Sequence, residues 1–466
     1  MTQRSALTAL VSLSLLAASP AWSSETARRI EEEKRESFDK EIEKNSLEDD
    51  RFILDYGGWL NFRYDDFYEP DNDSSTPDLF NYRTALDLRL WLRLSLRPWP
   101  EEPLKNNHSF YLRLKDAYTD RHYSSLTTGG GGDHDGPHVD YAYLSLDFEP
   151  CRIEAGRRYF SIGRGISYSD VNDGVEVSTA IADLDIAAFF SQTLPHQENI
   201  DTSVPGYDKE SQRQFYGFQS EYSGISGHRL YTYFLAQRDF SNERPEDTAR
   251  NYTYDSEYFG IGAEGGFSEL DYWVELIRQT GQSRIFATDE TRDVEAWGVD
   301  TGIRLDVDAY SHPRFSLQYA FGSGDSSRAD VANTLNGNLS AKDSNFLYFG
   351  YIGTGYALSP RLSNIHLYRL GLECKPLERC SFFKDLSLGI NFYRYYKDKS
   401  EGAISDLDAA QPSSDIGSEI DLNIDWQIFS DLNLSFEYGH FMPDDAYPGE
   451  ANDSEDYFSV STTFQF

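Results

Sequence analysis

The sequence predicts an all-β protein, a transmembrane antiparallel β-barrel of about 18 strands with short periplasmic turns and long extracellular loops. Three observations carry this prediction. Apolar and polar residues alternate strictly over long segments, and the connections between these segments are short and long in turn. The chain is also rich in Tyr and Phe, with 32 and 30 in 466 residues, and both favour strands.

The first 23 residues have the pattern of a secretory signal peptide. Arg4 precedes an apolar stretch from Ala6 to Ala18, and small residues follow up to Ser23. Residues 24–50 are rich in Glu, Lys and Arg, which indicates a solvated periplasmic segment, with a partner-binding helix as the alternative. We therefore divide the chain into a signal peptide (1–23), a charged N-terminal segment (24–50) and a barrel (51–466).

The segment LDLRLWLRLSLR at 86–97 shows the alternation most clearly. Its leucines occupy every second position, and the positions between them hold Asp, Arg, Trp and Ser. A period of two places these two sets on opposite faces of a strand. The segment EIDLNIDWQI at 419–428 repeats the pattern. Strands of 9–11 residues tilted across a bilayer suit such segments, so the apolar face is expected to meet lipid and the polar face the lumen.

The connections predict two different ends of the barrel. Short turns are expected at 149–150, 182–183, 223–226, 308–313 and 374–381. Long polar loops are expected at 161–172, 195–211, 240–252, 323–360 and 398–416. The amphipathic last strand ends on Phe466, which resembles the C-terminal signal of bacterial outer-membrane barrels. These features predict a place in the outer membrane of a Gram-negative bacterium.

About eighteen strands leave a water-filled channel, whose selectivity depends on the charged side chains that line it. Alternation directs several basic residues inward, together with one of Arg157 and Arg158: Arg63, Arg89, Arg93, Arg113, Lys115, Arg304 and Arg369. The later strands also direct acids inward: Asp271, Glu275, Asp300, Asp306, Asp421, Asp425 and Glu437. Clustered arginines favour a visiting anion. An ion-paired lumen that braces the barrel is the alternative.

Three segments resemble bacterial alginate-export outer-membrane proteins: 293–325 (DVEAWGVDTGIRLDVDAYSHPRFSLQYAFGSGD), 154–160 (EAGRRYF) and 361–372 (RLSNIHLYRLGL). The resemblance implies an eighteen-stranded barrel that passes an anionic polysaccharide through an arginine-rich constriction. It also implies that Arg157, Arg158 and Arg361 belong to the substrate path. The inward acids of the later strands depart from that pattern.

The net charge and the motifs of the sequence limit the classes of binding partner. A net charge of −36 argues against nucleic acid. We expect an acidic polysaccharide or an anionic solute, outer-membrane lipid and lipopolysaccharide around a monomer, and a periplasmic protein as a further candidate. No catalytic motif is present, so an enzyme is not expected. Alternative functions are an uptake porin for small anionic solutes, an outer-membrane enzyme and a structural sheath for periplasmic electron-transfer proteins.

No cofactor is expected, although the acidic loops 65–73 and 443–456 are candidates for Ca²⁺ despite lacking an EF-hand spacing. The nine histidines show no metal-binding spacing. Cys374 and Cys380 are close enough in the chain to close a small disulfide loop, while Cys151 is expected to be an inert thiol.

Overall fold

The computed structural model describes residues 46–48, 52–69, 72, 80–96, 108–123, 131–148, 150–194, 212–240, 254–285, 288, 290–328, 331, 338–339, 341–449 and 452–466. The predicted signal peptide lies outside these residues. None of the residues described forms a helix long and apolar enough to cross a membrane.

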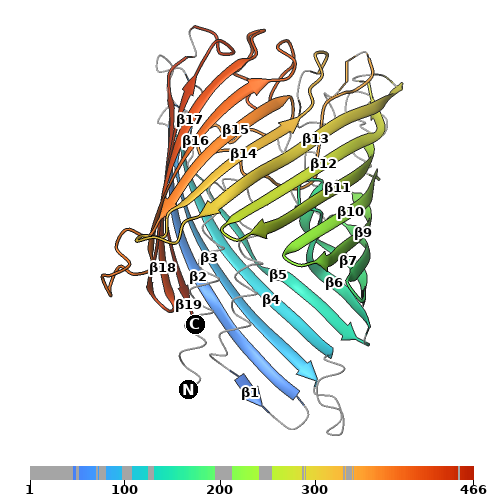
Figure 1. Cartoon of the computed structure of the whole chain (residues 1–466), viewed down its shortest axis with the longest axis vertical. Helices are drawn as coiled ribbons and strands as arrows, with labels where there is room; N and C mark the ends of the chain where they lie inside the picture. Colours follow the sequence, from blue (N-terminus) through green and yellow to red (C-terminus); the bar gives the residue numbers. More distant parts are fainter. Residues whose placement is uncertain are drawn as a thin grey trace.

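The described strands form one closed antiparallel sheet (Figure 1). The barrel strands are β2 (Phe52–Tyr68), β3 (Phe80–Leu96), β4 (His108–Tyr123), β5 (Gly131–Asp147), β6 (Cys151–Ile162), β7 (Tyr168–Ile181), β8 (Leu184–Gln192), β9 (Arg213–Ile225), β10 (His228–Asp239), β11 (Tyr254–Phe267), β12 (Leu270–Arg284), β13 (Thr291–Asp306), β14 (Arg314–Gly322), β15 (Ile365–Cys374), β16 (Leu386–Lys397), β17 (Asp415–Phe429), β18 (Leu432–Pro443) and β19 (Glu455–Gln465).

Closure joins the two ends of the chain. The last strand β19 pairs with β2, with Gln465 opposite Trp59, so the eighteen strands β2–β19 leave no open edge between first and last. A further short strand, β1 (Ser46–Glu48), lies within the predicted charged segment and pairs with β2. Closure matters because hydrocarbon offers no hydrogen bonds to an unpaired backbone. The predicted barrel is thus confirmed.

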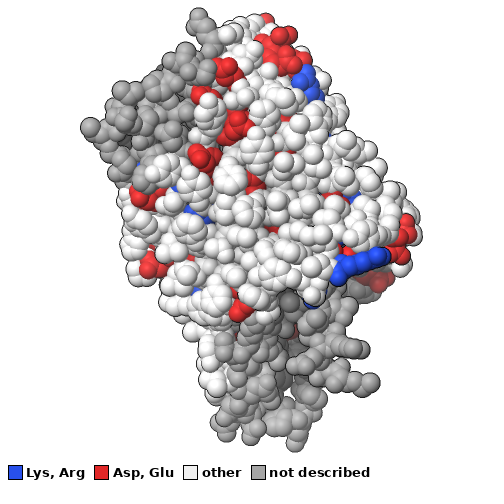
Figure 2. Space-filling model, turned by 90° about the vertical axis from the view of Figure 1, so that its left-hand side faces the viewer, with Lys and Arg blue, Asp and Glu red and all other residues white. Residues whose placement is uncertain are grey.

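The outer face carries the apolar residues of each strand. Leu86 and Leu90 of β3 and Leu422 and Ile424 of β17 are all exposed there. Figure 2 shows one side of this surface as largely uncharged. The alternation in the sequence therefore assigned the faces of these strands correctly, because successive side chains of a strand must point to opposite sides.

Strands β6 and β7 leave the barrel wall near their connecting turn. Strand β5 pairs with β6 only as far as Ala142 opposite Arg157, so residues 158–172 form a hairpin tip beyond the end of the β5–β6 ladder. One face of this tip packs through Tyr159 and Val171 against tyrosines on the inner wall of β4 and β5. We call residues 158–172 the inner hairpin. The sequence predicted an extracellular loop at 161–172, and this was wrong because the segment's aromatic residues are buried inside the lumen.

The connection between β14 and β15 also folds inward. Phe349 N donates a hydrogen bond to Ser167 O (3.0 Å), and Tyr351 N donates one to Gly165 O (2.9 Å), so this connection meets the inner hairpin. Its apolar residues join the central buried cluster: Phe346, Tyr348, Tyr356, Leu358 and Leu362. We call the described residues 341–364 the lumen loop. The sequence predicted a long extracellular loop at 323–360, and the structure has a long connection here, but residues 341–364 fold into the lumen because their apolar side chains are buried there.

Candidate pore and vestibule

A cavity of about 950 Å³ occupies the lumen next to the short-turn end of the barrel. Gly163–Ile166 of the inner hairpin and Tyr351–Gly353 of the lumen loop line one side of it. Other lining residues lie beside short turns, among them His228 at the start of β10 and Asp271 at the start of β12. We call this cavity the vestibule. Since the short turns are periplasmic, it lies on the periplasmic side of the two inward segments.

The charges of the vestibule nearly balance. Five arginines line it together with four acids: Arg164, Arg229, Arg304, Arg314 and Arg369, with Glu264, Asp271, Asp300 and Glu373. Most of these groups are ion-paired. Arg164 of the inner hairpin pairs with Glu264 and Asp300, each at 3.0 Å. Arg304 pairs with Asp271 across the β12–β13 register.

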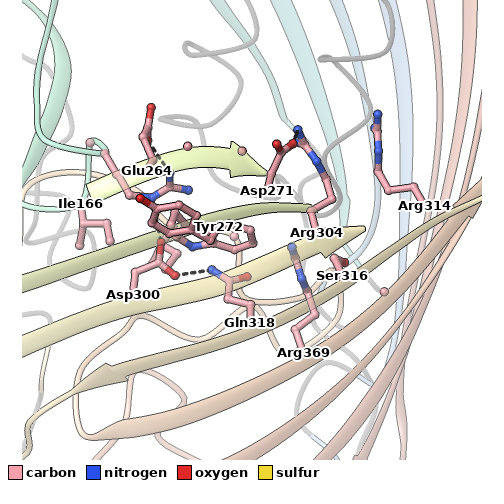
Figure 3. A pocket seen from close by; sticks show the side chains of 18 of the residues that line it. Ile166, Glu264, Asp271, Tyr272, Asp300, Arg304, Arg314, Ser316, Gln318 and Arg369 are labelled. Carbon is pink, nitrogen blue, oxygen red and sulfur yellow. Dashed lines mark hydrogen bonds and ion pairs between the residues drawn. The ribbon is translucent and has the colours of Figure 1, made fainter. Parts of the chain in front are cut away.

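Arg314 and Arg369 extend with Arg304 from the neighbouring strands β13–β15 into the vestibule (Figure 3). Arg314 pairs with Asp306 at 2.5 Å and with Glu373 at 3.5 Å. Arg369 differs, because no carboxylate of the described residues lies within ion-pairing distance of it, and its Nε has no hydrogen-bond partner there. Arg369 therefore presents an uncompensated positive charge at the vestibule.

Neutral polar and aromatic side chains complete the lining. Ser316, Gln318, Asn391 and Asn423 present hydroxyl and amide groups. The Arg164 guanidinium lies 5.2 Å from the ring centre of Trp273. Tyr272 also lines the vestibule (Figure 3). Such groups can exchange hydrogen bonds with water or with sugar hydroxyls. The vestibule is suited to a hydrated, polar solute.

The early strands hold their arginines in a different way. Arg89 and Arg113 are buried and share the carboxylate of Asp140, which lies 2.7 Å from Arg113 Nε. Asp140 is the extra residue of a β-bulge, since Arg113 pairs with Tyr141 and Leu114 with Val139. Because of the bulge, two successive residues of β5, Asp140 and Tyr141, both face the lumen. Asp87 also accepts from Arg89, at 2.7 Å.

Other basic residues of the early strands are ion-paired as well. Arg63 pairs with Asp65 (2.7 Å) and Glu437 (3.2 Å), and Lys115 pairs with Asp135 (2.8 Å). The Arg93 guanidinium lies 5.2 Å from the ring centre of Tyr111. These contacts show the bracing ion pairs that the sequence left open as an alternative.

The resemblance-derived residues lie in three different places. Arg158 faces inward and pairs with Glu154 (3.0 Å) and Glu176 (3.2 Å). Arg157 pairs with Asp173 (2.9 Å) on the outer face, because Asp173 lies on the same face of β7 as the exposed Val175. Arg361 lies in the lumen loop, where it donates to Tyr348 O (2.9 Å). The structure thus brings Arg158 and Arg361 inside and leaves Arg157 outside, and a role in the substrate path stays a prediction.

Sequence reasoning missed Arg164, Arg229 and Arg314. Arg164 lies in a segment that was expected outside the barrel. Arg229 and Arg314 stand at strand ends beside short turns, where the alternation is too brief to assign a face with ease. Extending the pattern of Tyr231 and Tyr233 back by two residues would have placed Arg229 in the lumen.

The remaining predictions concern metal and thiols. Within the described ranges, no group of three or more His, Cys, Asp or Glu side chains is arranged to hold a metal ion. Asp71, Asp73 and Glu450 of the acidic loops lie outside those ranges, so Ca²⁺ binding stays a prediction. Cys151, Cys374 and Cys380 are free thiols in the structure, so the suggested Cys374–Cys380 loop is not closed.

A closed eighteen-stranded barrel with a polar vestibule defines the class of porin-like outer-membrane channels. The family model described as "Alginate export" matches residues 80–461. The chain therefore belongs to the alginate-export family, as the sequence resemblance indicated.

Solved structures with the same fold support the architecture alone. OccAB1 of Acinetobacter baumannii shares 10% identity at a TM-score of 0.55, with 89% of this chain and 96% of that chain covered. OpdK of Pseudomonas aeruginosa, solved with vanillate, shares 10% identity at a TM-score of 0.53, covering 90% and 98%. OccK5 (OpdH) of Pseudomonas aeruginosa shares 9% identity at 0.53, covering 89% and 98%. No curated protein matches the chain.

Proposed function

We propose that this protein is a channel of the Gram-negative outer membrane that passes an acidic polysaccharide, alginate-like in its carboxylates, or fragments of it. Family membership supports transport rather than catalysis. The observation that carries the proposed anion preference is Arg369, an arginine in the vestibule without a carboxylate partner among the described residues. Passive movement through the lumen needs no bound cofactor.

The charge balance of the vestibule explains why one arginine without a carboxylate partner can give it a preference for anions. An arginine paired with a carboxylate contributes little net field, whereas Arg369 leaves the vestibule with one more cation than acids. A carboxylate of the solute can pair with its planar guanidinium through two hydrogen bonds. Asn391, Asn423 and Gln318 line the vestibule, and although Asn423 and Gln318 each donate to a carboxylate, their amide oxygens can accept from sugar hydroxyls. Several weak contacts of this kind hold a chain without stopping it, as conduction requires.

Uptake of small anionic solutes is the second candidate. The inner hairpin and the lumen loop meet through backbone hydrogen bonds on the extracellular side of the vestibule, which narrows the lumen there. A narrow path suits a single small carboxylate better than a thick polymer. Movement of the lumen loop would be needed before a polymer could pass.

The Arg369→Gln variant tests the proposal. We expect block of planar-bilayer current by a trimeric uronate to require about tenfold more ligand, the loss of one charge-assisted contact. Arg157→Gln is the matched control, because the same change is made on the outer face. Equal block of the Arg369→Gln channel and the unchanged channel would refute a role for Arg369 in anion selection.

A further inference from the structure

One carboxylate of the barrel wall holds the segment 356–358 of the lumen loop. Glu419 of β17 accepts hydrogen bonds from the backbone of Tyr356 (2.6 Å), Ala357 (2.8 Å) and Leu358 (3.1 Å). The Tyr395 hydroxyl lies 3.0 Å from Glu419 and 2.7 Å from Thr354 O, and its one proton is shared between the two acceptors. Bonds to an ionised acceptor are strong, so the three backbone N–H donors mark Glu419 as a stable buried anion. Glu419 therefore holds this part of the lumen loop, while Gln279 and Tyr258 of the wall bind the backbone of Leu347 further along the loop.

The next inward residue of the same strand has the opposite surroundings. Asp421 is fully buried, and neither of its carboxyl oxygens has a donor in hydrogen-bond geometry: the nearby amide of Tyr356 donates to Glu419 instead. A Cβ placed on Gly439 would lie 3.1 Å from Asp421 Oδ1 and 2.8 Å from Ala357 N. Asp421 thus lies directly beneath the segment that Glu419 holds.

Within the part of the chain that the structure describes, no cation forms an ion pair with Asp421. Its carboxyl group is within hydrogen-bonding reach of the Glu419 carboxyl group, and Glu437 of β18 adds further negative charge. Arg63 of β2 is 3.2 Å from Glu437, and Arg369 of β15 faces Tyr393 of β16. The other titratable groups facing the pair are the buried Glu455 of β19, which adds negative charge near Glu419, and tyrosines from β16 and the lumen loop: Tyr393, Tyr395 and Tyr356. Two carboxylates this close, away from water, cannot both ionise without a large cost.

We propose that Asp421 holds a proton, which it donates to Glu419, and that this carboxyl pair is a pH-sensitive latch on the lumen loop. The proton removes the repulsion between the two groups and satisfies Asp421. The latched state binds one more proton than a state in which the loop has left β17. The latch therefore holds at low pH and weakens as the pH rises.

The first test measures conductance, and so rests on the proposed channel activity. In planar bilayers, we expect the conductance of the full mature chain to increase as the pH is raised. Asp421→Asn should stay at the low-pH conductance throughout, because the amide remains neutral and can still donate to Glu419. Asp425→Asn is the matched control on the same strand and face, and should keep the pH response of the unchanged protein.

The second test does not depend on channel activity. A protonated buried carboxyl group gives a distinct infrared carbonyl band that shifts in D₂O. We expect this band at neutral pH in detergent-refolded protein, its loss in Asp421→Asn, and its retention in Asp425→Asn. An unchanged band in Asp421→Asn, or a conductance that responds to EDTA and Ca²⁺ rather than to pH, would overturn the proposal. The second outcome would place a metal ion at Asp421 instead of a proton.

Discussion

The inner wall of β2–β5 and the vestibule wall of β13–β15 both direct arginines into the lumen, but they hold them differently. On the first wall, Arg89 and Arg113 are buried and share Asp140. On the second, Arg304 forms a half-exposed pair and Arg369 has no carboxylate partner among the described residues. A buried ion pair is a structural group, while an exposed or unpaired arginine is available to a solute. Burial and pairing, more than the number of arginines, decide which wall interacts with an anion.

The largest effect is expected on the paired wall. Asp140→Ala removes the carboxylate that Arg89 and Arg113 share, and breaking a buried pair typically costs about 3–5 kcal/mol. The free energy of unfolding, measured by urea titration of the refolded barrel, should fall by an amount of that size. Asp135→Asn is the control: Asp135 is 56% exposed beside Lys115, and its loss should cost at most about 1 kcal/mol. Similar losses in both variants would contradict the view that burial makes the Asp140 ion pairs structural.

An intermediate effect is expected at Arg304 in the vestibule. Arg304 and Asp271 are 35% and 36% exposed, so solvent screens their interaction and Arg304→Gln should change stability by less than about 1 kcal/mol. The variant leaves four arginines and four acids around the vestibule in place of five and four. Reversal potentials in a salt gradient should therefore shift toward cations, and more so at low salt, where screening is weak. No shift at low salt would show that the vestibule does not control selectivity.

The smallest effect is expected at Arg157. Its guanidinium pairs with Asp173 on the outer face and also donates to Val139 O (2.9 Å). Arg157→Gln should reduce stability by at most about 1 kcal/mol and leave the reversal potential unchanged. Stability is measured by the temperature at which the folded form, which migrates differently on a gel, converts to the unfolded form. The reversal potential is measured by planar-bilayer recording. A changed selectivity would mean that Arg157 reaches the lumen, in agreement with the family resemblance and against its place in this structure.

The substrate path was harder to predict than the barrel. Alternation correctly directed Arg63, Arg89, Arg113 and Arg304 inward, because the geometry of a strand is local. Their partners could not be predicted in the same way. Asp140 reaches Arg89 and Arg113 only because a β-bulge shifts the register of β5, and nothing in the local period marks that shift.

The sequence by itself determined the barrel, its approximate strand number, and the lipid and lumen faces, because a period of two and the lengths of the connections are local properties of the chain. Only the tertiary structure decided that residues 158–172 and 341–364 fold into the lumen. Their inward course depends on contacts between distant segments, such as Phe349 with Ser167 and Glu419 with the backbone of Tyr356. A polar loop that contains a few aromatic residues has the same sequence pattern whether it is exposed to solvent or folded into the lumen of a barrel. The alternation of apolar and polar residues along the chain determines the barrel, whereas contacts between residues far apart in the sequence determine the path through its lumen.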